Sequence, residues 1–130
     1  MRYLQTAMQE ARAFTISVSG ADGGPAVVSV AGELDIAGAP ELALAFGNLE
    51  RSDVRAVAVD LSELTFIDSS GISAIATAVR EAQARGGSMV VAAPAGDVRR
   101  VFEIVRFGEF VPLEDSLAAA LLRLEPGPSA

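Results

Sequence analysis

The sequence contains no cysteine, no histidine and no lysine. Without cysteine the chain has no disulfide, no thiolate nucleophile and no cysteine-based metal site. Without histidine it lacks the usual proton carrier near neutral pH and the commonest metal ligand. Without lysine, Schiff-base chemistry and the lysine of a P-loop nucleotide site are excluded. We therefore expect a protein with no enzymatic activity, no cofactor and no metal.

Positive charge is also scarce. The ten basic residues, all arginine, face 17 acidic ones, and the net charge of -7 opposes binding to a nucleic-acid backbone. No apolar run reaches the roughly 18–20 residues that a membrane span needs. Polar residues such as Arg2 and Glu10 interrupt the start of the chain, which is therefore unlike a signal peptide. These features predict a soluble cytoplasmic protein whose partner is another protein or a small molecule.

The chain is long enough for one domain with a proper core. It has 130 residues, of which 51% are hydrophobic and 21% charged, so a disordered chain is excluded. We expect the domain to span residues 13–124, with an N-terminal extension over residues 1–12 and a tail over 125–130. Within the extension, four apolar residues would share one face of a helix, namely Leu4, Ala7, Met8 and Ala11.

Hydrophobic periodicity alternates between strand and helix patterns, which predicts an α/β fold. The predicted strands are residues 14–19, 26–31, 56–61, 89–93 and 110–113, and the helical faces begin at Leu42, Ile72, Val98 and Leu117. A Gly- and Pro-containing turn over residues 20–25 makes the first two strands an antiparallel hairpin. The later strands should be parallel, because helices connect them. We thus expect a small mixed β-sheet with about four helices, and Ile104, Phe107 and Phe110 in its core.

A cluster of small polar residues follows the third predicted strand, after a short loop. Ser69 or Ser70 could cap the helix that begins here, and Asp68 would favour its positive end. Gly71 leaves the backbone open, so another protein could approach closely. Asp60, at the end of the strand, is more consistent with fixing the corner than with catalysis.

This segment resembles the signature of the STAS domain of anti-sigma factor antagonists, approximately Asp-Leu-Ser-x-Leu-x-Phe-(Ile/Met)-Asp-Ser-(Ser/Thr)-Gly. The matching residues are Asp60, Leu61, Ser62, Leu64, Phe66, Ile67, Asp68, Ser69, Ser70 and Gly71. A second motif, Gly32-Glu33-Leu34-Asp35, is similar to the segment that follows the second strand in that family. The strand at 87–91 and the helix at 98–102 also resemble the family.

The resemblance implies a partner switch. By position, Ser69 would be phosphorylated by an anti-sigma factor that is itself a serine kinase, and a metal-dependent serine phosphatase would reverse the modification. The partner-contacting surface would consist of Glu33, Asp35, Asp68, Ser69, Ser70 and Gly71. We expect the protein itself to tolerate the phosphate, because free N–H groups and the helix dipole would face it. A monomer or weak dimer is expected.

Other interpretations stay open at this point. Asp35 could serve only as a turn and capping residue. A serine hydrolase would need a base beside Ser69 or Ser70, and histidine and lysine are both missing. A receiver-like phosphoacceptor at Asp60 would need a lysine on a late strand and an acidic pair after the first. Within the resembling family, a kinase-independent scaffold or a transporter-accessory domain is the alternative.

Overall fold

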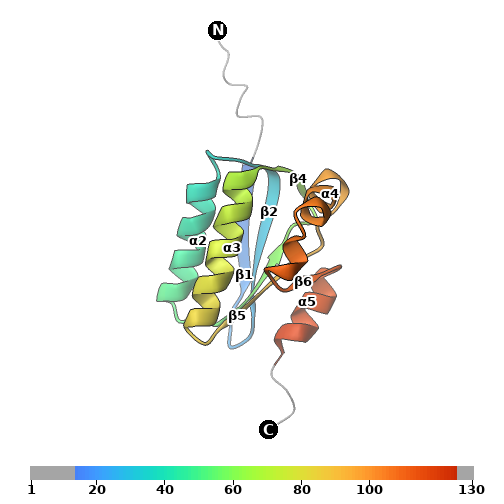
Figure 1. Cartoon of the computed structure of the whole chain (residues 1–130). Coiled ribbons are helices and arrows are strands. Elements are labelled where there is room, and N and C mark those ends of the chain that lie inside the picture. The colour runs from blue at the N-terminus through green and yellow to red at the C-terminus, as the bar shows by residue number, and fades with distance from the viewer. Residues whose placement is uncertain (1–13, 126–130) are drawn as a thin grey trace.

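The computed structural model describes residues 14–125, so the expected extension (1–12) and all but the first residue of the expected tail lie outside the described residues. The elements in chain order are β1 (Phe14–Gly20), β2 (Ala26–Leu34), α2 (Ala39–Arg51), β3 (Ala56–Asp60), β4 (Leu64–Ile67), α3 (Ser69–Ala84), β5 (Ser88–Ala92), α4 (Gly96–Ile104), the 3-10 turn η1 (Phe107–Glu109), β6 (Leu113–Glu114) and α5 (Leu117–Leu124) (Figure 1).

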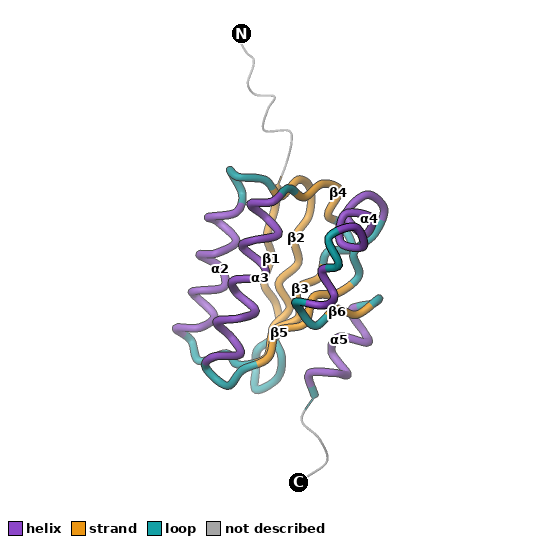
Figure 2. The backbone as a smooth tube through the Cα atoms, viewed as in Figure 1, coloured by secondary structure: helices purple, strands orange, loops and turns teal. Residues whose placement is uncertain are grey.

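The strands form one mixed sheet in the order β1-β2-β3-β5-β6. β1 and β2 are an antiparallel hairpin, whereas β2–β3, β3–β5 and β5–β6 are parallel pairs. Each of these parallel connections contains at least one helix (Figure 2), as a parallel crossover requires. The predicted α/β class, the N-terminal hairpin and the parallel later strands are confirmed.

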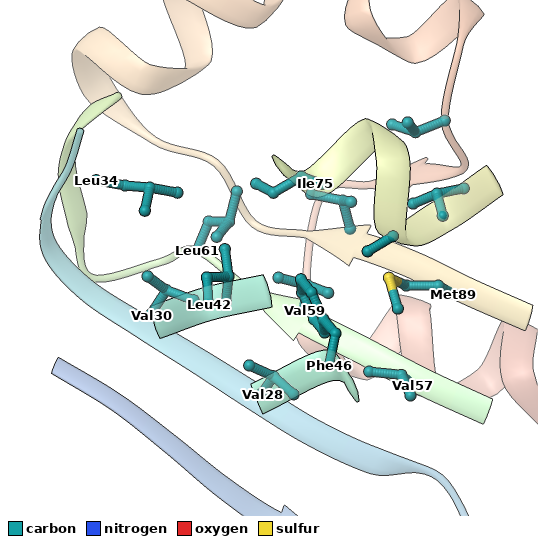
Figure 3. Close-up of a cluster of buried hydrophobic side chains, with 14 of the residues drawn as sticks. Val28, Val30, Leu34, Leu42, Phe46, Val57, Val59, Leu61, Ile75 and Met89 are labelled. Carbon is teal, nitrogen blue, oxygen red and sulfur yellow. The ribbon is translucent and has the colours of Figure 1, made fainter. Parts of the chain in front are cut away.

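The two faces of the sheet bury different helices. Alternate residues of the central strands point to opposite faces, so Val57 and Val59 of β3 join the larger core, whereas Ala58 joins a smaller one. The larger core contains the inner faces of α2 and α3 and part of α4, and α5 covers the smaller one. Figure 3 shows the larger core, in which Leu42 and Ile75 pack over the valines of β2 and β3.

Two strand boundaries differ from those expected. β2 continues three residues past its predicted end at Ala31, and residues 64–67, predicted as loop, form the additional strand β4. β4 pairs in parallel with residues 32–34 at the end of β2, whereas residues 26–29 of β2 pair with β3. The register of this pairing shifts between Gly32 and Glu33. In β4 the two end residues are buried and the two middle residues are exposed, so the alternation that predicts a strand is missing.

The segment after α4 also departs from expectation. Phe107 is buried and its ring lies 4.5 Å from that of Phe102, but Ile104 and Phe110 are 73% and 68% exposed, so their predicted burial is wrong. The chain turns sharply at Arg106, which adopts a left-handed conformation (φ 55°). This turn directs only one of the three side chains inward. The last strand is Leu113–Glu114 and not residues 110–113, since Pro112 has no N–H for a ladder bond.

Candidate functional site

The two sequence motifs meet at one end of the sheet, where β2 and β4 finish side by side. Glu33 pairs with Phe66, and Leu34 pairs with Ile67. One step further on, the N–H of Asp68 donates to the carbonyl of Leu34 at 3.2 Å. The residues after β2 and the residues that start α3 therefore form one continuous surface, although more than 30 positions separate them in the sequence.

Asp68 caps the helix that begins this surface. It has an extended backbone (φ -115°, ψ -173°), and its Oδ1 accepts from the N–H groups of Ser70 at 2.9 Å and Gly71 at 3.2 Å. A carboxylate in this position satisfies two helix donors that have no partner within the helix and also interacts favourably with the helix dipole. The expected cap by Ser69 or Ser70 is therefore wrong: the carboxylate before them holds the donors.

Ser69 is consequently left without a structural task. It is the first residue of α3, its side chain is exposed, and its hydroxyl makes no hydrogen bond to any part of the chain between residues 14 and 125. Ser70 is half-buried and lines a groove between α2 and α3. Of the two adjacent serines, Ser69 is thus the more exposed.

The side of Gly71 on which a side chain would lie faces the interior of the protein, not a partner. It is buried, and a Cβ built on it would lie 2.7 Å from Cγ of Leu34 and 2.9 Å from Cγ1 of Ile67. Real Cβ atoms do not approach other atoms so closely, so glycine is required for α3 to pack against the ends of β2 and β4. The expectation that Gly71 opens the backbone to another protein is corrected: it positions the serines by close helix packing.

The acidic residues of the second motif, Gly32-Glu33-Leu34-Asp35, occupy the neighbouring corner. Glu33 is exposed, and Asp35 is half-buried with its Oδ1 accepting from Ala37 at 3.0 Å and from Gly38 at 3.3 Å. Asp35 therefore does act as a turn residue, and it fixes the loop that leads into α2. Asp60 plays a similar part at its own corner, where its Oδ1 accepts from the N–H of Ser62 at 3.0 Å.

Two exposed apolar side chains lie next to this surface: Ile36, which the sequence did not single out, and Phe66, which was identified only as part of the signature. Ile36 is 75% exposed and follows Asp35, and Phe66 is 46% exposed and pairs with Glu33. Large apolar side chains next to an exposed polar cluster are typical of protein–protein interfaces. The available signal was the broken alternation of residues 64–67, which leaves Phe66 without a core position.

The surface offers side chains that can contact a partner and an exposed hydroxyl that can accept a covalent group. In the stretch from 14 to 125, no group of three His, Cys, Asp or Glu side chains is placed to hold a metal ion. Over the same residues, no helix is both long enough and apolar enough to cross a bilayer. The site is an exposed hydroxyl at a rigid helix start, bordered by carboxylates and two apolar side chains.

Fold and site together define a small α/β domain that presents an exposed serine, at a capped helix N-terminus, beside a second acidic motif. This chain belongs to the STAS domain family, whose model matches residues 16–120. The resemblance seen in the sequence is thereby confirmed.

Solved structures support the assignment. An anti-sigma factor antagonist from Mycobacterium paratuberculosis is 30% identical, with a TM-score of 0.77 over 87% of this chain and 95% of that one. The Bacillus cell fate determinant SpoIIAA in its phosphorylated form is 20% identical, with a TM-score of 0.66 over 85% and 100% of the two chains. A sulfate transporter family protein from Wolinella succinogenes is 15% identical, with a TM-score of 0.68 over 82% and 88%. The last two show the shared fold alone.

Proposed function

We propose that this protein is an anti-sigma factor antagonist, that it binds an anti-sigma factor with serine kinase activity, and that phosphorylation of Ser69 ends this binding. The observation that carries the proposal is the environment of Ser69, whose exposed hydroxyl makes no hydrogen bond within residues 14–125 and follows directly on the paired ends of the two motifs. The similarity to the Mycobacterium paratuberculosis antagonist supports the same role.

The binding surface consists of Glu33, Asp35, Ile36, Phe66, Asp68, Ser69 and Ser70, with Gly71 beneath them as a packing residue. Its apolar members supply area that a partner can bury, and its carboxylates favour a partner with basic residues. Exposed Ile36 follows Asp35 directly, and exposed Phe66 pairs with Glu33, so both apolar side chains are next to the acidic residues that a partner would cover.

Phosphorylation at Ser69 changes this surface without requiring a new fold. A phosphate adds about -1.5 to -2 charges at pH 7 and considerable bulk. At a close-packed interface, both the bulk and the desolvation of the charge oppose binding. A protein with the same fold, SpoIIAA, has been solved in a phosphorylated form, so the fold can carry the modification. A metal-dependent serine phosphatase would restore the unmodified protein.

The chain itself performs no catalysis in this proposal. Ser69 receives a phosphoryl group from the kinase, and the activating base, the nucleotide and the metal all belong to the partner enzymes. Histidine, cysteine and lysine are absent from the sequence, which is consistent with this passive role. Hydrolysis of an ester or nucleotide by the purified protein, lost in Ser69→Ala, would contradict it.

The test combines phosphopeptide mapping with titration calorimetry. Serine kinases of the anti-sigma type from the source organism are incubated with ATP and either the wild-type protein, Ser69→Ala or Ser70→Ala. We expect modification on Ser69, its loss in Ser69→Ala and its retention in Ser70→Ala, the matched control. Unmodified protein and Ser69→Ala should bind the kinase, and phosphoprotein should bind at least tenfold more weakly.

Equal binding of phosphorylated and unmodified protein would overturn the switch. A kinase-independent scaffold or a transporter-accessory domain would then be the better account. The similarity in fold to the Wolinella succinogenes protein is the reason for keeping that alternative as an outcome.

A further inference from the structure

A groove between α2 and α3 begins at the proposed binding surface, with which it shares Ile36 and Ser70, and the rest of its length has no role in that surface. It encloses about 470 Å³. Small side chains form its walls, among them Ala43 and Gly47 of α2 and Ser73 and Thr77 of α3, and the floor is apolar. Because the wall residues are small, the two helices leave room between them for another element to lie along both.

We propose that residues 2–12 of this same chain bind in the α2–α3 groove as an amphipathic helix. Leu4, Ala7, Met8 and Ala11 recur at the i, i+3, i+4 and i+7 spacing by which a helix presents one apolar face to a hydrophobic groove. The polar residues Arg2, Gln5, Gln9 and Arg12 fall on the opposite side of such a helix. The inference concerns the chain alone and does not rest on the proposed function.

The chain enters the domain close to one end of the groove. The ring of Phe14, the first residue of β1, lies against Gly38, on which a Cβ would be only 3.0 Å from the ring. Ile36, Ala39 and Pro40, which lie within two positions of Gly38 in the sequence, line the groove at this end. In Figure 1 the start of β1 lies at the end of the molecule where α2 and α3 also begin. Only Ala13 then lies between residue 12 and Phe14, so the docked segment has to enter the groove at this end.

The lengths agree. Eleven helical residues are about 16 Å long, and the stretch of α3 from Ser70 to Glu81, which lines the groove, has the same length. A helix that starts at the Ser70 end and runs along α3 would thus bring Arg2 to the level of Glu81.

The charges at that far end fit this direction. The groove ends among Glu50, Asp53, Arg55, Glu81 and Arg85. Arg85 pairs with Glu50 at 2.9 Å and Arg55 with Asp53 at 3.5 Å, whereas Glu81 has no ion pair within residues 14–125. Arg2 is the first residue of the docked helix, so its long side chain can extend past the helix end toward this carboxylate although its position lies on the outer side.

Because residues 2–12 are covalently linked to the domain, even a weak interaction with the α2–α3 groove is sufficient for docking. A helix of this length is marginal on its own in water, so it needs the groove to form. A linked segment has an effective concentration in the millimolar range, so docking does not require high intrinsic affinity. Because Ser70 lines the groove, the docked segment would also border one side of Ser69.

The experiment uses the full chain and its lack of cysteine. A nitroxide is attached to Gln5→Cys, which then carries the only thiol, and amide signals are compared before and after reduction of the label. We expect the signals of Ala43, Gly47, Thr77 and Ala78 to lose most of their intensity. Adding Leu4→Asp and Met8→Asp to the labelled chain should restore them.

A matched pair tests the groove side. Ala43→Glu places a charge in the groove on an exposed helix position and should restore the signals of Thr77 and Ala78. Leu44→Glu changes the next residue, which is 61% exposed and outside the groove, and should leave the loss in place. Circular dichroism confirms that each variant is folded.

Two results would overturn the proposal. One is a loss of intensity confined to residues near Phe14, with the α2–α3 groove unaffected. The other is a loss of the groove's amide signals when isotope-labelled wild-type chain is mixed with spin-labelled chain that carries no isotope label. In that case the segment of one chain would bind to the groove of a second copy. Neither result bears on whether Ser69 is phosphorylated, so this inference and the proposed function can fail separately.

Discussion

The cap at the start of α3 offers the sharpest test of the site's architecture. In Asp68→Ala, the N–H groups of Ser70 and Gly71 lose their acceptor, which lies 2.9 and 3.2 Å away in the wild-type protein. Loss of a helix cap costs about 0.5–2 kcal/mol, and loss of a negative charge at a helix N-terminus costs about 0.3–1 kcal/mol. We therefore expect Asp68→Ala to lower the free energy of unfolding by roughly 1–3 kcal/mol.

Asp68→Asn separates the two contributions. Its side-chain oxygen can still accept from the same donors, so only the charge–dipole part, about 0.3–1 kcal/mol, should be lost. Stability should decrease in the order wild type, Asp68→Asn, Asp68→Ala. Each 1 kcal/mol corresponds to a shift in melting temperature of roughly 3–6 °C for a domain of this size.

Urea unfolding followed by circular dichroism measures these differences, and calorimetry confirms that the transition is two-state. Ser69→Ala is the matched control, because the Ser69 hydroxyl makes no hydrogen bond within the described part of the chain. It should change stability by less than about 0.5 kcal/mol. If Ser69→Ala destabilises the protein as much as Asp68→Ala does, the serine and not the aspartate is the cap, and the account of the site is wrong.

Three further predictions concern the same surface. In urea unfolding, Gly71→Ala should lower the free energy of unfolding by about 1–3 kcal/mol, because the new Cβ overpacks against β2 and β4. In the control Gly47→Ala the new Cβ would meet only the flexible end of an arginine at 3.4 Å, so this change should be neutral or stabilising by up to about 1 kcal/mol. Equal effects of the two changes would refute the packing role of Gly71. Ser69→Asp should keep the melting temperature but bind the kinase at least tenfold more weakly in calorimetry, a loss of about 1.4 kcal/mol, and unchanged affinity would count against the charge mechanism. Phe66→Ala should also weaken kinase binding at least tenfold with the fold intact, whereas Leu122→Ala on the exposed side of α5 should leave it unchanged; the reverse pattern would place the interface elsewhere.

The sequence predicted those parts of the fold that depend on a regular hydrophobic period. The buried faces of α2 and α3 follow the 3.6-residue repeat, and β3 and β5 are short, largely apolar runs. Such patterns reflect burial on a single regular face, which local sequence carries directly. The order of strands and helices, and with it the α/β class, followed from these elements.

The errors fall where tertiary contacts override the local pattern. β4 exists because the shifted end of β2 provides it with a partner, and four residues with burial only at their ends show no strand period. Ile104 and Phe110 have the composition of core residues but lie on the outside of a turn that depends on the left-handed backbone of Arg106. The position of that turn is not visible in the spacing of apolar residues.

The site shows the same division between what local sequence contains and what packing decides. The motif residues were identified from the sequence, and β2–β4 pairing explains why the two motifs are adjacent. Their individual roles were not. Asp68 takes the donors that either serine could have held, and Gly71 turns inward because Leu34 and Ile67 occupy the space that a side chain would need.

The cap by Asp68 also alters how the proposed switch would work. We expected free N–H groups at the start of α3 to face the phosphate, but the N–H groups of Ser70 and Gly71 are already bonded to a carboxylate. A phosphate on Ser69 would therefore add about -1.5 to -2 charges beside an existing negative charge, with Glu33 and Asp35 on the same surface. Since the helix terminus has already neutralised part of one charge, it has less capacity for a second. The new charge would act mainly on a partner that binds to this surface. A modification of this kind can repel the partner while the fold stays intact.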